Sequence, residues 1–200
     1  MDKTIIPIAS GKGGVGKSFM AANLAVALAE LGKKVIVADL DFGGSNLHTC
    51  LGINNKHPGI GDFIRARYSN LDNLLVETGN DNLKFLAGDV RSPFLANMHH
   101  AQKMRLIYNL KQLKFEYLIL DLGSGSTYNT LDFFSMTQLG MIISTTEHTS
   151  TTNMLTFLKL LAFRVIERSL PKNTFLNEKI RESYNRTVMD GMLTVRELLD

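Results

Sequence analysis

The sequence predicts an α/β fold with a doubly wound, mostly parallel sheet and helices on both faces. Short apolar runs alternate with helical patterns along the 200 residues, as expected for βαβ units. Several runs are near-continuous Val, Ile and Leu, which is typical of strands buried on both faces. Glycine and aspartate follow these runs closely, and in such sheets ligands bind beyond the carboxyl ends of the strands. We therefore expect one α/β domain with a binding site at that edge.

Five strands are predicted from these apolar runs, each followed by polar or glycine-containing segments. Their lengths of four to six residues are typical of strands in globular proteins. The predicted strands are residues 4–9, 34–39, 83–86, 117–121 and 141–145.

The first two helices have clear end signals. A helix over residues 17–31 carries an apolar face at helical spacing and should stop at Gly32, since glycine favours the left-handed conformation that ends helices. The members of that face are Ala21, Leu24, Ala25, Leu28 and Leu31. A long helix is predicted over 93–113, with Ser92 as its N-cap and Pro93 at its first position.

The C-terminal third is less regular. A helix is predicted over 151–166, after a turn rich in Thr and Ser. Residues 167–186 are polar and read as a loop, and 187–199 form an amphipathic pattern. We expect residues 1–166 to form the core, and 167–200 to be a polar loop and helix that make an incomplete end of the same domain.

Composition excludes several classes of protein. The hydrophobic fraction is 44%, which is ordinary for a globular chain, and a net charge of +3 is too small to indicate nucleic-acid binding. A single cysteine, Cys50, excludes an internal disulfide and a Cys-x-x-Cys metal pair. No signal peptide is recognised, and the longest apolar stretch contains Lys159 and Arg164. We expect a cytoplasmic protein; peripheral contact with a membrane or with DNA stays open.

A phosphate-binding loop is predicted between the first strand and the first helix. Residues 10–18 read Ser-Gly-Lys-Gly-Gly-Val-Gly-Lys-Ser, which meets the pattern G-x-x-x-x-G-K-[ST]. Backbone N–H groups of such a loop surround the phosphates, Lys17 contacts them as a point charge, and the Ser18 hydroxyl can ligate Mg²⁺. We expect the nucleotide to contact Gly11, Lys12, Gly13, Gly14, Val15, Gly16, Lys17, Ser18 and Phe19.

Aspartates close two further strands. Asp39 and Asp41 follow the second strand, and Asp121 follows the run Tyr-Leu-Ile-Leu. An apolar strand ended by aspartate is the Walker B arrangement, in which the carboxylate holds the Mg²⁺ shell, usually through water. With the phosphate loop on the first strand, the three carboxylates are expected at one edge of the sheet.

Lys12 makes the loop more specific. The run Lys-Gly-Gly-Val-Gly-Lys-Ser resembles the deviant Walker A signature of the MinD/ParA class of ATPases. In that class the early lysine reaches across a dimer interface to the other subunit's phosphates, so the resemblance implies this role for Lys12.

The resemblance extends over about residues 4–160. The pattern Asp-x-Asp-x-Gly-x-x-Asn-Leu from residue 39 is similar to switch I, where the first aspartate lies near Mg²⁺ and the second orients the attacking water. That similarity implies those roles for Asp39 and Asp41. Asp-Leu-Gly-Ser-Gly from Asp121 resembles switch II, where the N–H of Gly125 would sense the γ-phosphate. Residues 46–52 look most like MinD and FlhG/FleN relatives.

Two departures from the family are visible. A Pro-Glu-Pro-Thr-like turn common after the fifth strand is replaced by Thr-Glu-His-Thr at 146–149, and no base-binding segment is recognised. Base specificity is therefore left open, as is any C-terminal membrane-targeting helix.

The resemblance implies an ATP-hydrolysing molecular switch that uses ATP and Mg²⁺. It would form a homodimer when ATP is bound and act on a protein partner or cargo adaptor in division, flagellar or partition machinery. Catalytic roles fall on Lys12, Lys17 and Asp41, and metal binding on Ser18, Asp39 and Asp121.

Other functions remain alternatives. The chain could be a regulatory scaffold that binds nucleotide with little turnover, or a ligase-like enzyme of similar core. A tyrosine-kinase-like enzyme would need a tyrosine-rich tail, and only Tyr184 occurs late in the chain. An iron–sulfur carrier is disfavoured by the single cysteine.

Overall fold

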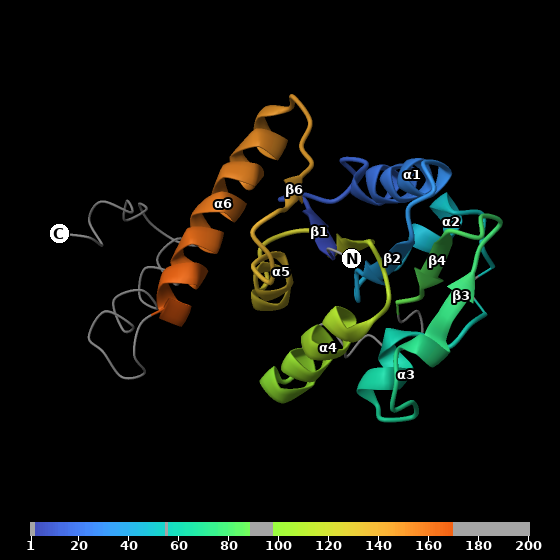
Figure 1. Cartoon of the computed structure of the whole chain (residues 1–200). Helices are drawn as coiled ribbons and strands as arrows, with labels where there is room; N and C mark the ends of the chain where they lie inside the picture. Colours follow the sequence, from blue (N-terminus) through green and yellow to red (C-terminus); the bar gives the residue numbers. More distant parts are fainter. Residues whose placement is uncertain (1–2, 55, 89–97, 170–200) are drawn as a thin grey trace.

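A computed structural model describes residues 3–54, 56–88 and 98–169. In these ranges the chain forms one sheet of six strands in the order β3-β4-β2-β5-β1-β6. Figure 1 shows the elements along the chain. The strands are β1 (Thr4–Ala9), β2 (Val35–Leu40), β3 (Leu75–Glu77), β4 (Leu83–Leu86), β5 (Tyr117–Leu122) and β6 (Met141–Ile142). The helices are α1 (Lys17–Glu30), α2 (Leu47–Cys50), α3 (Ile60–Ile64), α4 (His100–Gln112), α5 (Tyr128–Phe134) and α6 (His148–Ser169), with a 3-10 turn, η1, at Asp72–Leu74.

The sheet is parallel except at one edge. β1 lies between β5 and β6, and β5 lies between β1 and β2, all in parallel register. Only β3 runs antiparallel, against β4. In the register of β2 and β5, Asp39 stands directly opposite Asp121. The predicted mostly parallel sheet is therefore confirmed, and its central strands bring two of the predicted aspartates side by side.

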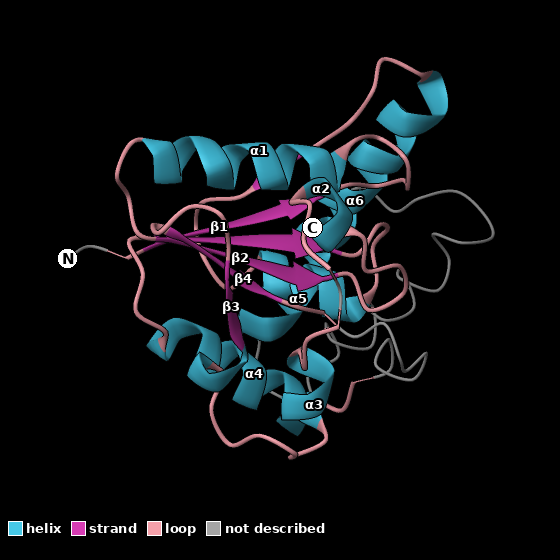
Figure 2. Ribbon diagram, turned by 90° about the vertical axis from the view of Figure 1, so that its right-hand side faces the viewer, coloured by secondary structure: helices cyan, strands magenta, loops and turns pink. Residues whose placement is uncertain are grey.

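Helices cover both faces, as predicted. All six residues of β2 are buried, and they divide alternately between two cores because successive side chains of a strand point to opposite faces. Val35 and Val37 pack with α1, whereas Ile36, Ala38 and Leu40 pack in a core that contains α3, α4, α5 and α6. Figure 2 shows α1 and α2 on one side of the strands and α3 and α4 on the other.

Helix α1 approaches the sheet through small residues. Its buried positions include Ala21, Ala22, Ala25 and Ala29, whose short side chains allow close contact with the strands. The predicted face is wrong at its last member, since Leu31 is 76% exposed. The helix ends at Glu30, and Gly32 has a positive φ of 78°, which confirms the predicted stop.

Two predicted elements begin or end elsewhere. β6 ends at Ile142 rather than at residue 145, because the following segment bonds to the start of α6: the N–H of Thr145 donates to Ser150 Oγ at 3.1 Å. Helix α4 begins at His100, and the His99 N–H donates to Gln102 Oε1 at 3.1 Å. The predicted start at Ser92 and Pro93 lies outside the described residues.

Helix α6 is longer than predicted. It spans His148–Ser169 instead of 151–166, so residues 167–169 are helical and not part of a loop. The rest of the predicted loop 167–186 and the predicted helix 187–199 lie outside the described residues. Four short helical elements and β3 were not predicted, because each is brief and has no clear apolar period. No helix within the described ranges is both long and apolar enough to cross a bilayer.

Candidate functional site

The phosphate loop joins β1 to α1 at the carboxyl edge of the sheet. β1 ends at the buried Ala9, and the loop turns through Gly14 and Gly16, whose φ values are +80° and +89°. Only glycine adopts these values without strain, which explains the glycine at both positions. Helix α1 begins at once at Lys17. Its first-turn N–H groups lack helical partners and carry partial positive charge, so the loop and helix together form an anion-binding element.

Lys17 and Asp121 form a buried ion pair inside this edge. Lys17 Nζ lies 2.5 Å from Asp121 Oδ1, and the two side chains are 7% and 1% exposed. Burial raises the pKa of Asp121, and this outweighs the opposing effects of Lys17 and Ser18. The second carboxylate oxygen, Oδ2, is buried without a hydrogen-bond partner among the described residues. The pair therefore keeps one acceptor oxygen available to a cation or to a metal-bound water.

Asp39 is held beside this pair by hydrogen bonds from its own loop. Its Oδ2 accepts from Ser45 Oγ at 2.5 Å and from the Leu47 N–H at 3.2 Å. Its Oδ1 accepts from the Asp41 N–H at 3.0 Å. Burial raises the pKa of Asp39 to about 6, and the neighbouring Asp121 charge contributes to the rise. No cation contacts Asp39 among the described residues, so its charge is stabilised by hydrogen bonds alone.

Asp41 lies outside the strand, in the loop that follows β2. Its Oδ1 accepts from the N–H groups of Gly43 and Gly44 at 3.1 and 3.0 Å, which fixes the carboxylate on its loop. It borders a cavity of about 370 Å³ between this loop and the one after β5, and Gly123 and Asn129 line the same cavity. A water molecule has ample room there, next to the carboxylate.

Lys12 points toward the start of α6. Its Nζ lies 3.1 Å from Glu147 Oε2 and 3.4 Å from Thr149 Oγ1. This ion pair is exposed, with side-chain exposures of 42% and 67%. Gly11, beside it, fits closely under the same helix, because a Cβ there would lie 2.4 Å from the backbone oxygen of Asn153. The phosphate loop is thus covered on one flank by α6.

The loop after β5 also contacts the phosphate loop. The Gly125 N–H donates to the Ser10 carbonyl at 2.9 Å, and Gly125 has a φ of +81°. The Ser10 hydroxyl is buried without a partner in the described part of the chain. The two loops are therefore joined directly by a backbone hydrogen bond.

The predicted site residues divide into two groups. Lys17, Ser18, Asp39 and Asp121 come together at the carboxyl ends of β2 and β5, with Asp41 at their edge. Lys12 instead contacts α6, and Phe19 is 62% exposed on the surface of α1.

Some contributors were not predicted. Ser45 and Leu47 hold Asp39 in place, although both lie within the segment that resembles switch I. Glu147 lies in the turn that departs from the family pattern, and its contact with Lys12 spans 135 residues of sequence. Local patterns carry no signal for a pairing at that distance.

The donor atoms suit Mg²⁺ bound together with a nucleotide. Ser18 offers a hydroxyl and Asp121 a free carboxylate oxygen, and hard oxygen donors are those that Mg²⁺ prefers. Within the described ranges, no group of three or more His, Cys, Asp or Glu side chains could hold a metal ion.

Comparison with known proteins gives concordant results. A family model described as "ParA: NUBPL iron-transfer P-loop NTPase" matches residues 2–163. Septum site-determining protein MinD of Synechocystis is 33% identical over 199 residues, covering 98% of this chain and 71% of that protein. The antiactivator FleN of Pseudomonas aeruginosa is 31% identical over 158 residues, covering 78% of this chain and 56% of that protein.

A solved structure agrees with the model in fold. MinD of Pyrococcus horikoshii, complexed with Mg-ADP, superimposes with a TM-score of 0.70 at 26% identity, over 80% of this chain and 65% of that one. The chain thus spans between about half and seven tenths of the length of these relatives. With its phosphate loop, its paired strand-end aspartates and these matches, the chain belongs to the ParA family of P-loop NTPases and is similar to the MinD and FleN members of that family.

Proposed function

We propose that this protein binds and hydrolyses ATP as a molecular switch of the MinD/ParA type. The observation that carries the proposal is the buried Lys17–Asp121 pair beside the phosphate loop, in which the second oxygen of Asp121 has no hydrogen-bond partner within the described residues. A cation and an acceptor at this position match the two charges of a Mg²⁺–polyphosphate ligand. The Mg-ADP held by the Pyrococcus relative supports the same ligand class for this chain.

Nucleotide binding would use the phosphate loop and the strand ends. Residues 11–18 would surround the phosphates with N–H groups, and Lys17 would contact them as its pairing with Asp121 loosens. Ser18, Asp39 and Asp121 would hold Mg²⁺, directly or through water. Bound Mg²⁺ would neutralise charge on the phosphate oxygens.

Hydrolysis would depend on positioning and charge. Asp41 is fixed by two backbone N–H groups beside a cavity that admits water, so it can orient an attacking water molecule. The N–H of Gly125, which donates to the Ser10 carbonyl, would donate to the γ-phosphate instead. Lys12 would supply positive charge to the phosphates of a second copy, as an arginine finger does in other P-loop enzymes.

The position of Lys12 supports a switch between two states. In the single chain its ammonium group is paired with Glu147, so it does not neutralise the chain's own phosphate site. The pair is exposed, and exposed pairs contribute little stability, which makes release of Lys12 inexpensive. On dimerisation with ATP, the ammonium group of Lys12 would leave Glu147 and contact the phosphates bound to the second copy.

A Lys12→Ala variant tests this proposal by separating binding from assembly. We expect affinity for a fluorescent ATP analogue to stay within about threefold of wild type, because Lys12 points away from its own site. ATP-dependent light scattering and phosphate release should both be lost. Lys33→Ala is a matched control, since Lys33 is also exposed and paired with a glutamate, Glu116 at 3.4 Å. Full dimerisation and turnover in Lys12→Ala would show that Lys12 is only a loop charge.

The same assays distinguish the alternatives. A scaffold would bind nucleotide and dimerise without releasing phosphate. The names of the relatives favour division or flagellar machinery as the process controlled, through a protein partner. Iron transfer, the activity named for the matching family, is less well supported for this chain, because the chain has a single cysteine, Cys50.

A further inference from the structure

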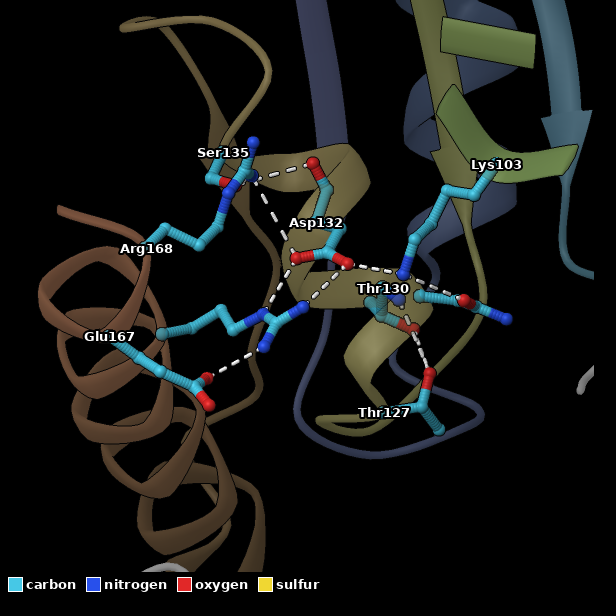
Figure 3. A network of polar contacts seen from close by, with 9 residues as sticks. Lys103, Thr127, Thr130, Asp132, Ser135, Glu167 and Arg168 are labelled. Carbon is cyan, nitrogen blue, oxygen red and sulfur yellow. Dashed lines mark hydrogen bonds and ion pairs between the residues drawn. The ribbon is translucent and has the colours of Figure 1, made fainter. Parts of the chain in front are cut away.

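A buried network of charges joins three helices on the face of the sheet opposite α1. Asp132 of α5 is its centre, and Lys103 of α4 contacts Asp132 Oδ2 and donates to Asn129 Oδ1 at 3.2 Å. From α6, Arg164 donates Nε to Asp132 Oδ1 at 2.7 Å and Nη2 to Oδ2 at 3.0 Å. Figure 3 shows Lys103 and Arg168 approaching Asp132 from opposite sides.

The most buried charges of the network are paired with each other. The side chains of Asp132 and Lys103 are 5% and 6% exposed, and a charge buried this deeply is tolerated only when it is paired. Although burial opposes ionisation, the hydrogen bonds from Arg164 and Lys103 hold the pKa of Asp132 below its ordinary value. Glu167 accepts from Arg164 Nη1 at 2.6 Å and balances its remaining charge. The carboxylate of Asp132 is thus held from two directions in a fixed orientation.

Helix α6 connects this network to the phosphate loop. Near its start, the backbone of Asn153 lies so close to Gly11 that no Cβ would fit between them. Arg164 is eleven residues further along, or about 16 Å at 1.5 Å per residue. A helix of this length behaves as a rigid element, so a shift where it meets Asp132 would be transmitted to the loop.

Helix α5 connects the network to the loop after β5. The helix starts directly after that loop, and Thr127 Oγ1 caps it by accepting from the Thr130 N–H at 3.2 Å. Asn129, which accepts from Lys103, also lines the cavity beside Asp41. The loop's Gly125 N–H in turn donates to Ser10 of the phosphate loop.

We propose that Asp132 is a positioning residue that locks α5 to α6 and thereby holds the loop containing Gly125 in register with the phosphate loop. The inference rests on the proposed function for its effect on hydrolysis, although its effect on the loops does not need turnover. It differs from a purely stabilising role, because the contacts lead from one carboxylate to both loops that would surround the γ-phosphate.

Amide hydrogen exchange on the nucleotide-free protein tests the proposal without any activity assay. In Asp132→Asn, the Gly125 and Thr130 amides should exchange roughly tenfold faster than in wild type. Local opening around them would no longer be opposed by the ion pair between α5 and α6. The Phe85 amide in β4 should change only with global stability. Amides that exchange by local opening do not respond to global stability, so a merely stabilising role would leave Gly125 and Thr130 unchanged. Unchanged rates in a folded variant would overturn the proposal.

Two further variants complete the test. Glu77→Gln is the control: Glu77 is 68% exposed and paired with Lys84 at 2.6 Å, so all three amides should exchange as in wild type. Should Asp132→Asn not fold, Arg164→Lys keeps the positive charge but loses the paired hydrogen bonds to Asp132, together with the contact of the guanidinium with the Tyr128 ring. About threefold faster exchange is then expected. No change in Arg164→Lys would overturn the proposal in that case.

Turnover provides the second readout. Phosphate release by Asp132→Asn should fall at least roughly tenfold, because small displacements of positioned groups cost that much or more. Affinity for the fluorescent nucleotide should stay within about threefold. If wild type releases no phosphate, the proposed hydrolysis fails while the exchange result still decides the role of Asp132. An equal loss of turnover and affinity would contradict positioning.

Discussion

Two buried carboxylate sites in this protein are similar in burial and opposite in charge balance. Asp39, at the carboxyl edge of the sheet, is fully buried and has hydrogen bonds but no cation, and its pKa is raised to about 6. Asp132, between the helices, is also buried and is held by Lys103 and Arg164, and its pKa is lowered. Burial raises the pKa of both carboxylates, so the difference comes from the cations that contact Asp132 and from the Asp121 charge beside Asp39.

The difference in charge balance separates a ligand site, which contains Asp39, from a structural ion-pair network, which contains Asp132. A carboxylate without a cation stabilises the fold poorly at neutral pH, and it gains most when a cation arrives. Asp121 is intermediate, since Lys17 contacts one of its oxygens and the other has no hydrogen-bond partner within the described residues. A carboxylate that already has its cations gains nothing from a metal, and it can only lose stability when a partner is removed. The edge of the sheet is therefore arranged for a ligand, and the Asp132 network is complete without one.

The largest effect on stability is expected from breaking the complete network. Asp132→Ala should lower the free energy of unfolding by about 3–5 kcal/mol at pH 7, because Lys103 would be left as a buried charge without its ion-pair partner and Arg164 would keep only Glu167. Urea denaturation measures it, with Glu77→Gln as a control expected to lie within about 1 kcal/mol of wild type. A loss below about 1 kcal/mol would mean that water reaches the network and that the burial of Asp132 has little energetic weight.

The pH dependence of stability should separate the two carboxylates. Because the pKa of Asp39 is higher in the folded state, about 6 against 3.8, its contribution to stability is present at low pH and is lost as the pH rises through 6. In metal-free protein, the free energy of unfolding of wild type relative to Asp39→Asn should fall by about 2 to 3 kcal/mol between pH 4 and pH 7. A flat difference would contradict the raised pKa.

Asp132 should show the opposite sign. Its pKa is lowered by folding, so its contribution is present above the ordinary value of 3.8 and is lost as the pH falls below it. The free energies of unfolding of wild type and Asp132→Asn should therefore converge as the pH falls. Urea denaturation at a series of pH values measures this difference and the one between wild type and Asp39→Asn.

A smaller effect is expected where α6 covers the phosphate loop. In Gly11→Ala the new Cβ would lie 2.4 Å from the backbone of Asn153, so the helix or the loop must move. We expect a loss of about 1–3 kcal/mol in the free energy of unfolding, as for other overpacked sites. Gly79→Ala is the matched control, because a Cβ there has open space around it. Equal free energies of unfolding for wild type and Gly11→Ala would show that α6 and the phosphate loop can move apart at little cost.

The smallest effect on stability is expected at Lys12. Its pair with Glu147 is exposed, so Lys12→Ala should change the free energy of unfolding by less than about 1 kcal/mol. Thermal unfolding at low and high salt measures this difference. A larger loss would mean that Lys12 fastens α6 in the single chain, and its release on dimerisation would then be costly.

Sequence patterns predicted most strands of the sheet well, because they depend on local signals. Continuous apolar runs located β1, β2, β4 and β5 to within one residue at each end. The edge strand β3 has only three residues and no alternation, so it carried no comparable signal. Predicted Lys17, Asp39 and Asp121 meet because parallel strands bring their carboxyl ends to one edge, which is a property of the topology.

The Asp132 network could not be predicted in the same way. Lys103, Asp132 and Arg164 are separated by 29 and 32 positions, and each reads as an ordinary charge in a helical or polar segment. Helix α5 itself was missed, since its first turn contains Asn and Thr, although Thr127 is a recognisable N-cap. Which charges meet inside the fold depends on how α4, α5 and α6 pack on the sheet, and single-sequence patterns do not report that packing.

We expect nucleotide to bind at the carboxyl edge of the sheet and not at the Asp132 network. Titration of a fluorescent ATP analogue with Mg²⁺ into wild type, Lys17→Ala and Asp132→Asn tests it most directly, after each variant has been shown to be folded. We predict that Lys17→Ala loses at least about a hundredfold in affinity, because backbone N–H groups cannot replace its charge, whereas Asp132→Asn stays within about threefold. Undiminished binding by Lys17→Ala, or an equal loss in both variants, would contradict the account.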